Sequence, residues 1–181
     1  MTSAIHGFAA VLVVLAACEK APAEPSANAP PAPGRVSSPL SWSAPPSWTV
    51  EHQAERGPVR ARYSIPAAGA SKHPAELLIL VLEGGASADV AAKLDELLAQ
   101  FEGPEVDKAR RDDLRVCELE IVLLDVGGTY KMPMGPELGR GKKHAAHVLE
   151  EGWRAIAAGV KTRDRGTWMF RLLGPNDTVE A

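Results

Sequence analysis

The sequence contains little cysteine and has no strong excess of charge of either sign. Of its 181 residues only Cys18 and Cys117 are cysteines, so the part of the chain after Cys18 cannot form an internal disulfide. The 20 basic side chains nearly balance the 23 acidic ones, which gives a formal net charge of -3. Because no stripe of basic residues with interleaved aromatics is present either, we do not expect nucleic acid as a partner.

Recognisable catalytic motifs are also missing. The sequence has no Gly-x-Ser-x-Gly elbow, no His-Glu-x-x-His helix and no paired-cysteine set. Scattered Asp and Glu residues cannot be given acid and base roles without geometry. We therefore expect a protein that is not an enzyme and that needs no cofactor.

An uncharged apolar run occupies the N-terminus. Residues 4–17 have no charged side chain, and this run is shorter than the roughly 20 apolar residues that span a bilayer, which is typical of a signal-peptide core. It closes with Leu15-Ala16-Ala17-Cys18, which resembles the lipobox of bacterial lipoproteins. The resemblance implies that residues 1–17 are a cleaved signal peptide and that Cys18 carries a diacylglyceryl thioether and an acylated amino group. Two or three acyl chains would hold the protein on a membrane almost permanently.

The residues on either side of the run bear on where the protein is exported. Met1 to Gly7 contains no Lys or Arg, where an exported precursor normally has a positive segment. The alternative is therefore an unprocessed N-terminus with an ordinary buried Cys18. Glu19 is not the aspartate that retains similar enterobacterial lipoproteins in the inner membrane, so the resemblance implies lipid anchoring in the outer membrane, on its periplasmic side or at the cell surface.

A proline-rich linker follows the lipid site. From Glu19 to Pro46 the chain is dominated by Ala, Pro and Ser, a composition that does not form helices or strand ladders. The prolines favour a semi-rigid spacer of up to about 3 Å per residue. A proline-rich partner motif is the alternative, but no basic residue recurs beside the prolines. Trp42 is the one unusual residue, and we interpret it as the point where the chain first touches the domain.

Residues 47–181 have the length of one domain with a single core. Residues 48–52 and 59–65 read as two strands of a hairpin, and in the second strand apolar residues alternate with charged or polar ones. The continuous apolar run over 75–82 predicts a strand that is covered on both faces, in the middle of a sheet.

An amphipathic helix is predicted after this strand. Ser87 is the expected N-cap, with Asp89 in the first turn, where its charge favours the helix dipole. Apolar residues recur at helical spacing from Val90 to Phe101, and the helix is expected to end at Gly103.

One long strand is predicted over 114–126. It places Cys117 among the apolar set, which favours a buried core thiol over a reactive or metal-binding one. From residue 127 to about 147 the pattern is lost among Gly, Pro, Lys and Met, which predicts a long loop that is functional or disordered.

The C-terminal part predicts a second hairpin, formed by 152–161 and 166–173. Residues 177–180 then have the Asp-x-x-Glu spacing of a capping box, and the sequence stops just where a helix would begin. Three residues of the last strand share one face and are expected to meet the amphipathic helix: Trp168, Phe170 and Leu172.

Several short motifs of this region resemble a group of uncharacterised bacterial lipoproteins with a PsbP-like domain. The resemblance implies an α+β fold in which one or two helices pack on an antiparallel sheet, and it is silent on activity. In similar sequences a closing helix follows the Gly-Pro pair, and here that helix is expected to be missing. The motifs are Trp48, Pro58 to Tyr63, Gly84-Gly85, Gly128 to Tyr130, Trp153 to Ala158 and Phe170 to Pro175.

Two histidines are the candidate metal ligands. His144 and His147 are three residues apart, a spacing that could present both imidazoles on one helical face to zinc or copper, with Glu150 and Glu151 nearby. Two ligands do not make a site, and solvated loop histidines are the alternative reading.

A basic stretch precedes these histidines. Gly139-Arg140-Gly141-Lys142-Lys143 invites comparison with a phosphate-binding loop, but the required first glycine is replaced by Pro136, and Lys143 stands where Ser or Thr should bind magnesium. With Lys131, these side chains could contact anionic lipid headgroups or cell-wall polymers; a solvated charged loop is the alternative.

Taken together, the sequence predicts a lipid-anchored cell-envelope protein whose α+β domain is a non-catalytic binding or structural module. Its expected partners are the membrane, through the lipid on Cys18, and another envelope protein or a ligand. The alternative function is a metal-binding envelope protein that uses His144 and His147.

Overall fold

The computed structural model describes Leu40 and residues 42–54, 56–82, 89–116, 119–134, 146–162 and 166–181. The expected signal peptide, the lipid site at Cys18 and most of the linker lie outside the described residues, as do Ser87 and Cys117. Among the helices of the described part, none is long and apolar enough to cross a membrane.

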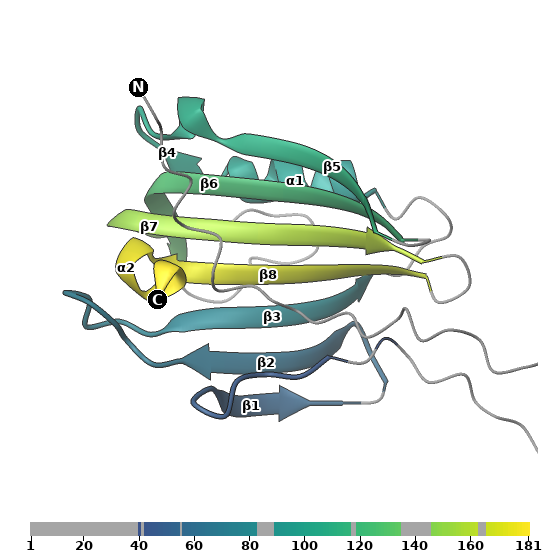
Figure 1. Cartoon of the computed structure of the whole chain (residues 1–181). Helices are drawn as coiled ribbons and strands as arrows, with labels where there is room; N and C mark the ends of the chain where they lie inside the picture. The colour runs from purple at the N-terminus through teal and green to yellow at the C-terminus, as the bar shows by residue number, and fades with distance from the viewer. Residues whose placement is uncertain are drawn as a thin grey trace, which may run out of the picture.

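The described chain forms one eight-stranded antiparallel sheet with two α-helices, so the expected α+β class is confirmed (Figure 1). The strand order is β1-β2-β3-β8-β7-β6-β4, and β5 also pairs with β6. The elements are β1 (Thr49–Gln53), β2 (Val59–Ile65), β3 (Ala75–Leu82), α1 (Val90–Leu98), β4 (Phe101–Glu102), the 3-10 turn η2 (Val106–Lys108), β5 (Arg110–Val116), β6 (Leu119–Met134), β7 (Ala146–Lys161), β8 (Thr167–Pro175) and α2 (Asn176–Glu180).

Both predicted hairpins are confirmed, β1 with β2 and β7 with β8. The predicted central strand is confirmed as well, because β3 lies between β2 and β8 and buries Leu77, Leu78 and Ile79. Consecutive residues of a strand point to opposite faces, so this burial requires cover on both sides of the sheet.

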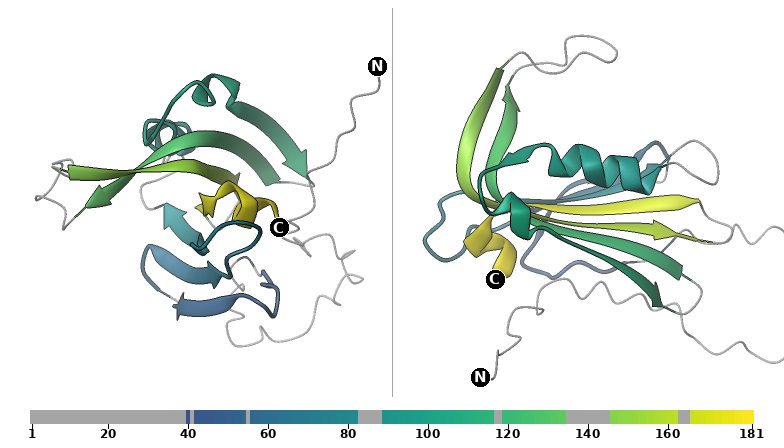
Figure 2. Two further views of the ribbon diagram at one scale, coloured as in Figure 1. Left: turned by 90° about the vertical axis from the view of Figure 1, so that its left-hand side faces the viewer. Right: turned by 90° about the horizontal axis from the view of Figure 1, so that it is seen from above.

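Different segments cover the two faces of the sheet (Figure 2). On one face, Leu94 and Leu97 of α1 pack in a cluster with Val126 and Met169. On the other face, the segment that begins at Leu40 and the helix α2 pack against a second cluster. That cluster includes Leu40, Tyr63, Ile79, Trp168, Phe170, Leu172 and Val179.

The expectation that Trp168, Phe170 and Leu172 meet the amphipathic helix is wrong. These three residues do share a face, but it is the face opposite α1. The residues of β8 that pack with α1 are Met169 and Leu173. Because β8 is buried on both faces, its hydrophobic pattern could not indicate which face the helix covers.

Helix α1 begins later than the expected N-cap at Ser87 implies, and it ends before its apolar stripe does. It begins at Val90, and Asp89 is the N-cap, whose carboxylate accepts a hydrogen bond from the amide of Ala92 at 3.2 Å. The helix ends at Leu98, and Phe101 continues the stripe from strand β4, where it is buried. The burial was therefore predicted correctly, but the conformation at Phe101 was not.

The single strand predicted over 114–126 is two antiparallel strands, β5 and β6, with Val116 opposite Leu119. Every residue of β5 is exposed, so the strand has no hydrophobic alternation that could indicate it. The long loop predicted over 127–147 is also wrong for its described part. Strand β6 continues to Met134 and β7 begins at Ala146, while residues 135–145 lie outside the described range.

A short helix, α2, follows the Gly-Pro pair, where a helix was expected to be missing. It begins at Asn176 with Pro175 as the N-cap, so the predicted capping box at Asp177 does not form. The carboxylate of Asp177 instead accepts a hydrogen bond from the amide of Ala70 at 3.1 Å.

Candidate functional site

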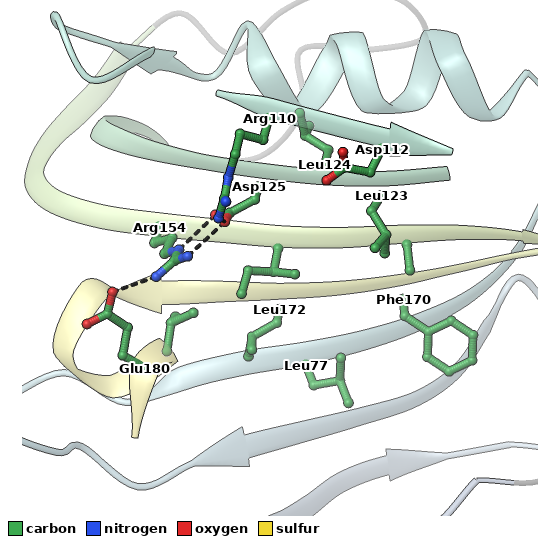
Figure 3. Close-up of a pocket in the computed structure, with 13 residues that line it drawn as sticks. Leu77, Arg110, Asp112, Leu123, Leu124, Asp125, Arg154, Phe170, Leu172 and Glu180 are labelled. Carbon is green, nitrogen blue, oxygen red and sulfur yellow. Dashed lines mark hydrogen bonds and ion pairs between the residues drawn. The ribbon is translucent and has the colours of Figure 1, made fainter. Parts of the chain in front are cut away.

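The sheet face opposite α1 contains a cavity of about 150 Å³ (Figure 3). Strands β3, β6, β7 and β8 supply its floor, and α2 closes one end. Most of the surface that lines it is apolar, because alternate residues of four neighbouring strands point to this face. Leu124, which belongs to the cluster on the α1 face, also borders the cavity. The other apolar lining residues are Leu77, Leu123, Ile156, Ala158, Phe170, Leu172 and Val179.

Charged side chains form one wall of the cavity, centred on Arg154 of β7. Its Nε and Nη2 donate to the two carboxylate oxygens of Asp125 on β6, both at 2.8 Å. Its Nη1 donates to Glu180 of α2 at 2.6 Å, and Arg110 of β5 donates to Asp125 at 3.1 Å (Figure 3). Four elements of the fold therefore meet at this wall.

Strand register brings these side chains together. Arg110 lies directly opposite Asp125, and Arg154 lies opposite Gly127, two residues further along β6. Side chains at such diagonal positions are within reach of each other when one of them is long. Since Gly127 has no side chain, nothing on the facing position competes with Arg154 for the space beside Asp125.

The wall holds its carboxylate in the ionised form. Partial burial disfavours the charge on Asp125, but the hydrogen bonds and positive charges of Arg154 and Arg110 outweigh it and lower the pKa of Asp125. The hydrogen bond to Asp125 likewise raises the pKa of Arg154, against the effect of burial. An ionised carboxylate with a lowered pKa has no proton to donate and is a weak base.

Helix α2 separates this cavity from a second one of about 270 Å³, which lies toward Trp48 and Ile65 of the β1–β2 side. Leu172 and Val179 line both cavities, and Val179 is almost fully buried. A helix of five residues is not stable by itself, so its position depends on tertiary contacts. The polar contacts come from Asp177, from Glu180, and from Thr178, whose hydroxyl accepts from the amide of Ala68 at 3.2 Å and donates to the carbonyl of His73 at 3.3 Å.

Trp42 packs on the same face, beyond Phe170. Its indole N–H donates to the hydroxyl of Tyr63 at 2.8 Å, and its ring lies 6.0 Å from that of Trp168 and 6.5 Å from that of Phe170, between centroids. The interpretation that the chain first touches the domain near Trp42 is consistent with these contacts, and Leu40 is the most N-terminal described residue in the same cluster.

Only one of the two candidate metal-binding histidines lies in the described part of the chain. His147 lies in strand β7 and not on a helix, and it is exposed. His144 lies outside the described residues. Within the described ranges, no group of three or more His, Cys, Asp or Glu side chains is close enough to hold a metal ion.

Of the predicted basic cluster, only Lys131 lies in the described part of the chain. It is on β6 and its ammonium group is 3.6 Å from the carboxylate of Glu102. Arg140, Lys142 and Lys143 lie outside the described residues.

Sequence reasoning missed the residues that form the cavity wall. Asp125 is the one charged residue in the run from Ile121 to Val126, and Arg154 stands between Trp153 and a run of apolar residues. A single charge in an otherwise apolar strand needs a partner when it is buried. This pattern could have predicted that Asp125 and Arg154 form an ion pair, although they are 29 positions apart in the sequence.

Comparisons of the chain with known family models, with curated proteins and with solved structures found no match. The resemblance to lipoproteins with a PsbP-like domain therefore stays a prediction from the sequence.

Proposed function

We propose that this chain is a lipid-anchored cell-envelope protein, held in the outer membrane through Cys18, whose domain binds an amphipathic ligand or partner segment without catalysis. The observation that supports binding is the cavity opposite α1, where an apolar floor meets a wall of paired charges. The anchor is supported by the sequence Leu15-Ala16-Ala17-Cys18 and by the proline-rich segment that follows it.

We also propose that the domain is PsbP-like. The support is an antiparallel sheet with a helix packed on one face, and a short helix after the Gly-Pro pair, where similar sequences have a closing helix. A fold of this kind does not assign an activity, so the function is argued from the cavity alone.

The size and lining of the cavity define the class of ligand. Apolar cavities of roughly 150 Å³ bind molecules of the size of benzene, so the floor here can accept one aromatic or branched aliphatic group. At the wall, Arg110 is largely exposed and Asp112 is exposed, so both can pair with polar groups of the same ligand. An amphipathic molecule or a peptide with one large apolar side chain meets both requirements.

Binding is tested with benzene as the probe, by following methyl resonances of the full chain in NMR spectra. We expect saturable shifts at Leu123, Leu172 and Val179, and none at Leu94 on the other face. Ala158→Leu fills the floor and should abolish these shifts, whereas Ala91→Leu, on the exposed side of α1, should leave them unchanged. Shifts that persist in Ala158→Leu, or that are absent in the unmodified chain, would refute the binding site.

The anchor is tested separately, by labelling cells that express the chain with radioactive palmitate. We expect label on the unmodified protein and none on Cys18→Ala. An unlabelled protein, or equal label on the variant, would remove the anchor and leave the cavity result untouched.

A further inference from the structure

Strand β5 is a free edge of the sheet. It pairs with β6 from Arg110 to Val116 in an unbroken register, and within the described part of the chain no strand pairs with its other side. Figure 1 shows β5 and β1 at opposite edges of the sheet. Because a free strand edge presents a row of N–H and C=O groups without partners, it can accept a strand from another molecule.

The two edges differ in how well they are protected against such pairing. Strand β1 has five residues and its register shifts between Val50 and His52, and short or irregular strands pair poorly with a further strand. Strand β5 has seven residues without a shift, and it contains neither proline nor glycine. Of the two edges, β5 is therefore the one suited to extending the sheet.

Two apolar side chains of β5 are exposed on one face of the strand. Leu114 and Val116 are each 44% exposed, and because they are two residues apart they point to the same side. This side is the cavity face, since Leu114 lies opposite Ile121, which is buried in the cluster on that face. A partner strand beside β5 would cover part of both side chains.

The charges of β5 are of both signs, and only some of them are paired within the chain. Arg110 and Arg111 pair with carboxylates of their own chain. Asp113 and Arg115 point to the α1 face, and no ion pair joins either of them to another residue in the described ranges. Glu120, the residue opposite Arg115 on β6, pairs instead with a lysine of β7 at 3.8 Å. Asp113 and Arg115 are therefore available to a partner.

Symmetry restricts how a second copy can pair with β5. When two identical strands pair antiparallel about a two-fold axis perpendicular to the sheet, facing side chains lie on the same face, so one residue must lie opposite its own counterpart. Like charges directly opposite each other are destabilising, which excludes every Arg and Asp of the strand as the central residue. An axis at Val116, where β5 ends, would leave most of the strand unpaired. Leu114 is the position that remains.

With the axis at Leu114, the flanking side chains of the two copies are complementary. Asp113 of each copy lies opposite Arg115 of the other, which forms two ion pairs on the α1 face, while Leu114 packs against its counterpart on the cavity face. Asp112, which lines the cavity, lies opposite Val116 of the other copy. The second copy therefore adds an apolar side chain at the margin of each cavity.

We propose that the protein forms a symmetric dimer in which the β5 strands of two copies pair antiparallel about Leu114 and join the two sheets into one. Because the axis is perpendicular to the sheet, both cavities lie on the same side of the joined sheet. One strand from each copy makes a small interface, and small interfaces belong to weak complexes, so the dimer should dissociate on dilution. The dimer requires neither a ligand in the cavity nor the lipid on Cys18.

Sedimentation equilibrium of the full chain measures the association, with Cys18 replaced by Ala so that neither acyl chains nor a disulfide at this position can join two copies. We expect a fraction of dimer that rises with concentration. Leu114→Asp places two carboxylates opposite each other on the axis and should weaken the dimer by about tenfold or more. Val50→Asp is the matched control, because Val50 is exposed to a similar degree, at 53%, on the β1 edge. The control should leave the association unchanged.

Two results would overturn the dimer. One is a chain that stays monomeric up to about 1 mM. The other is association that Leu114→Asp does not weaken, since copies that still associate must then meet through another surface. Neither result bears on the cavity, whose binding of benzene is measured separately.

The register is tested by reversing charges. Asp113→Arg alone brings arginines together at both flanking pairs, and Arg115→Asp alone brings carboxylates together, so each variant should dimerise about tenfold or more weakly than the unmodified chain. An equimolar mixture of the two variants restores both ion pairs and should form mixed dimers. Both residues are exposed, so the fold should persist, and circular dichroism checks this. A mixture that associates no better than its components would show that the strands do not pair about Leu114.

Discussion

The guanidinium of Arg154 holds the carboxylate of Asp125 through two hydrogen bonds of 2.8 Å each. The two side chains are mostly buried, with 17% and 23% of their surfaces exposed. Arg154 also pairs with Glu180, so the same residue connects the middle of the sheet to α2. One side chain therefore contributes both to the wall of the cavity and to the contacts that hold the last helix.

Replacing Arg154 with Ala should lower the free energy of unfolding by about 1–3 kcal/mol, because it leaves Asp125 partly buried without its main partner. Arg154→Lys should lose part of this amount, since an ammonium group cannot make the two-point contact. Urea denaturation measures both. Lys93→Ala is the control, because the exposed pair of Lys93 with Glu96 should contribute about 0.5 kcal/mol or less. Equal losses for Arg154→Ala and Lys93→Ala would contradict the assigned role.

The same pair should make stability depend on pH. The pKa of Asp125 is lower in the folded protein than its ordinary value of about 3.9, because the contributions of Arg154 and Arg110 outweigh the opposing effect of burial. The stabilisation is therefore complete above about pH 5 and is lost as the pH falls through the folded-state pKa. We expect the wild type to be more stable than Asp125→Asn at neutral pH and to lose that advantage in acid. A difference in urea midpoint that stays constant down to about pH 2 would argue against the pair as its origin.

Glycine at position 159 permits the close approach of α1 to β7. A Cβ at this position would overlap with a methyl group of Val90, the first residue of the helix. Val is stiff in a helix and cannot turn its methyls away without strain. Gly159→Ala should therefore destabilise the domain by about 1–3 kcal/mol, through overpacking.

The double variant Gly159→Ala with Val90→Ala tests this explanation. Removing the Val90 methyls should restore part of the lost stability, so the two substitutions together should cost less than their sum. Additive costs in thermal or urea unfolding would show that Gly159 matters for another reason, such as the strand conformation itself.

The elements that the sequence predicted correctly are those whose hydrophobic pattern lies within the element itself. Strands β2 and β3 and helix α1 each bury a face or both faces, and so each carries its own hydrophobic period. Strand β5 is exposed throughout, and Lys131 to Met134 continues a strand at the margin of the core without a buried residue, so neither segment has a hydrophobic period that reveals it.

The candidate site was less accessible to sequence reasoning than the fold. Its cavity is assembled from β3, β6, β7, β8 and α2, whose residues are far apart in the chain and meet only through the strand order. The orientation of β8 shows the same limit, since Phe170 and Met169 are both buried and only the position of α1 distinguishes their faces. Asp125 and Arg154 were visible as isolated charges in apolar strands, but their pairing needs the register of β6 and β7.

We expect the contacts of Trp42 to attach the end of the linker to the domain. Its ring packs on Trp168 and Phe170, and its indole N–H donates to Tyr63 at 2.8 Å. Trp42→Ala should cost about 2 kcal/mol of unfolding free energy through lost apolar burial. Tyr63→Phe should cost only about 1 kcal/mol, since it removes the hydrogen bond and keeps the ring.

If Trp42 attaches the end of the linker to the domain, its loss should also expose this segment to proteolysis. A loss of global stability alone does not predict this change. In Trp42→Ala, brief treatment of the folded protein with proteinase K should cut between Leu40 and Trp48, which the wild type should resist, because the segment no longer has its attachment to the sheet face. Mass spectrometry locates the cuts. Gly159→Ala is the control, since it weakens the domain on the opposite face and should leave this segment protected. Cuts that appear equally in both variants would mean that the segment opens with the whole domain, and that Trp42 contributes to the core without fixing where the linker ends.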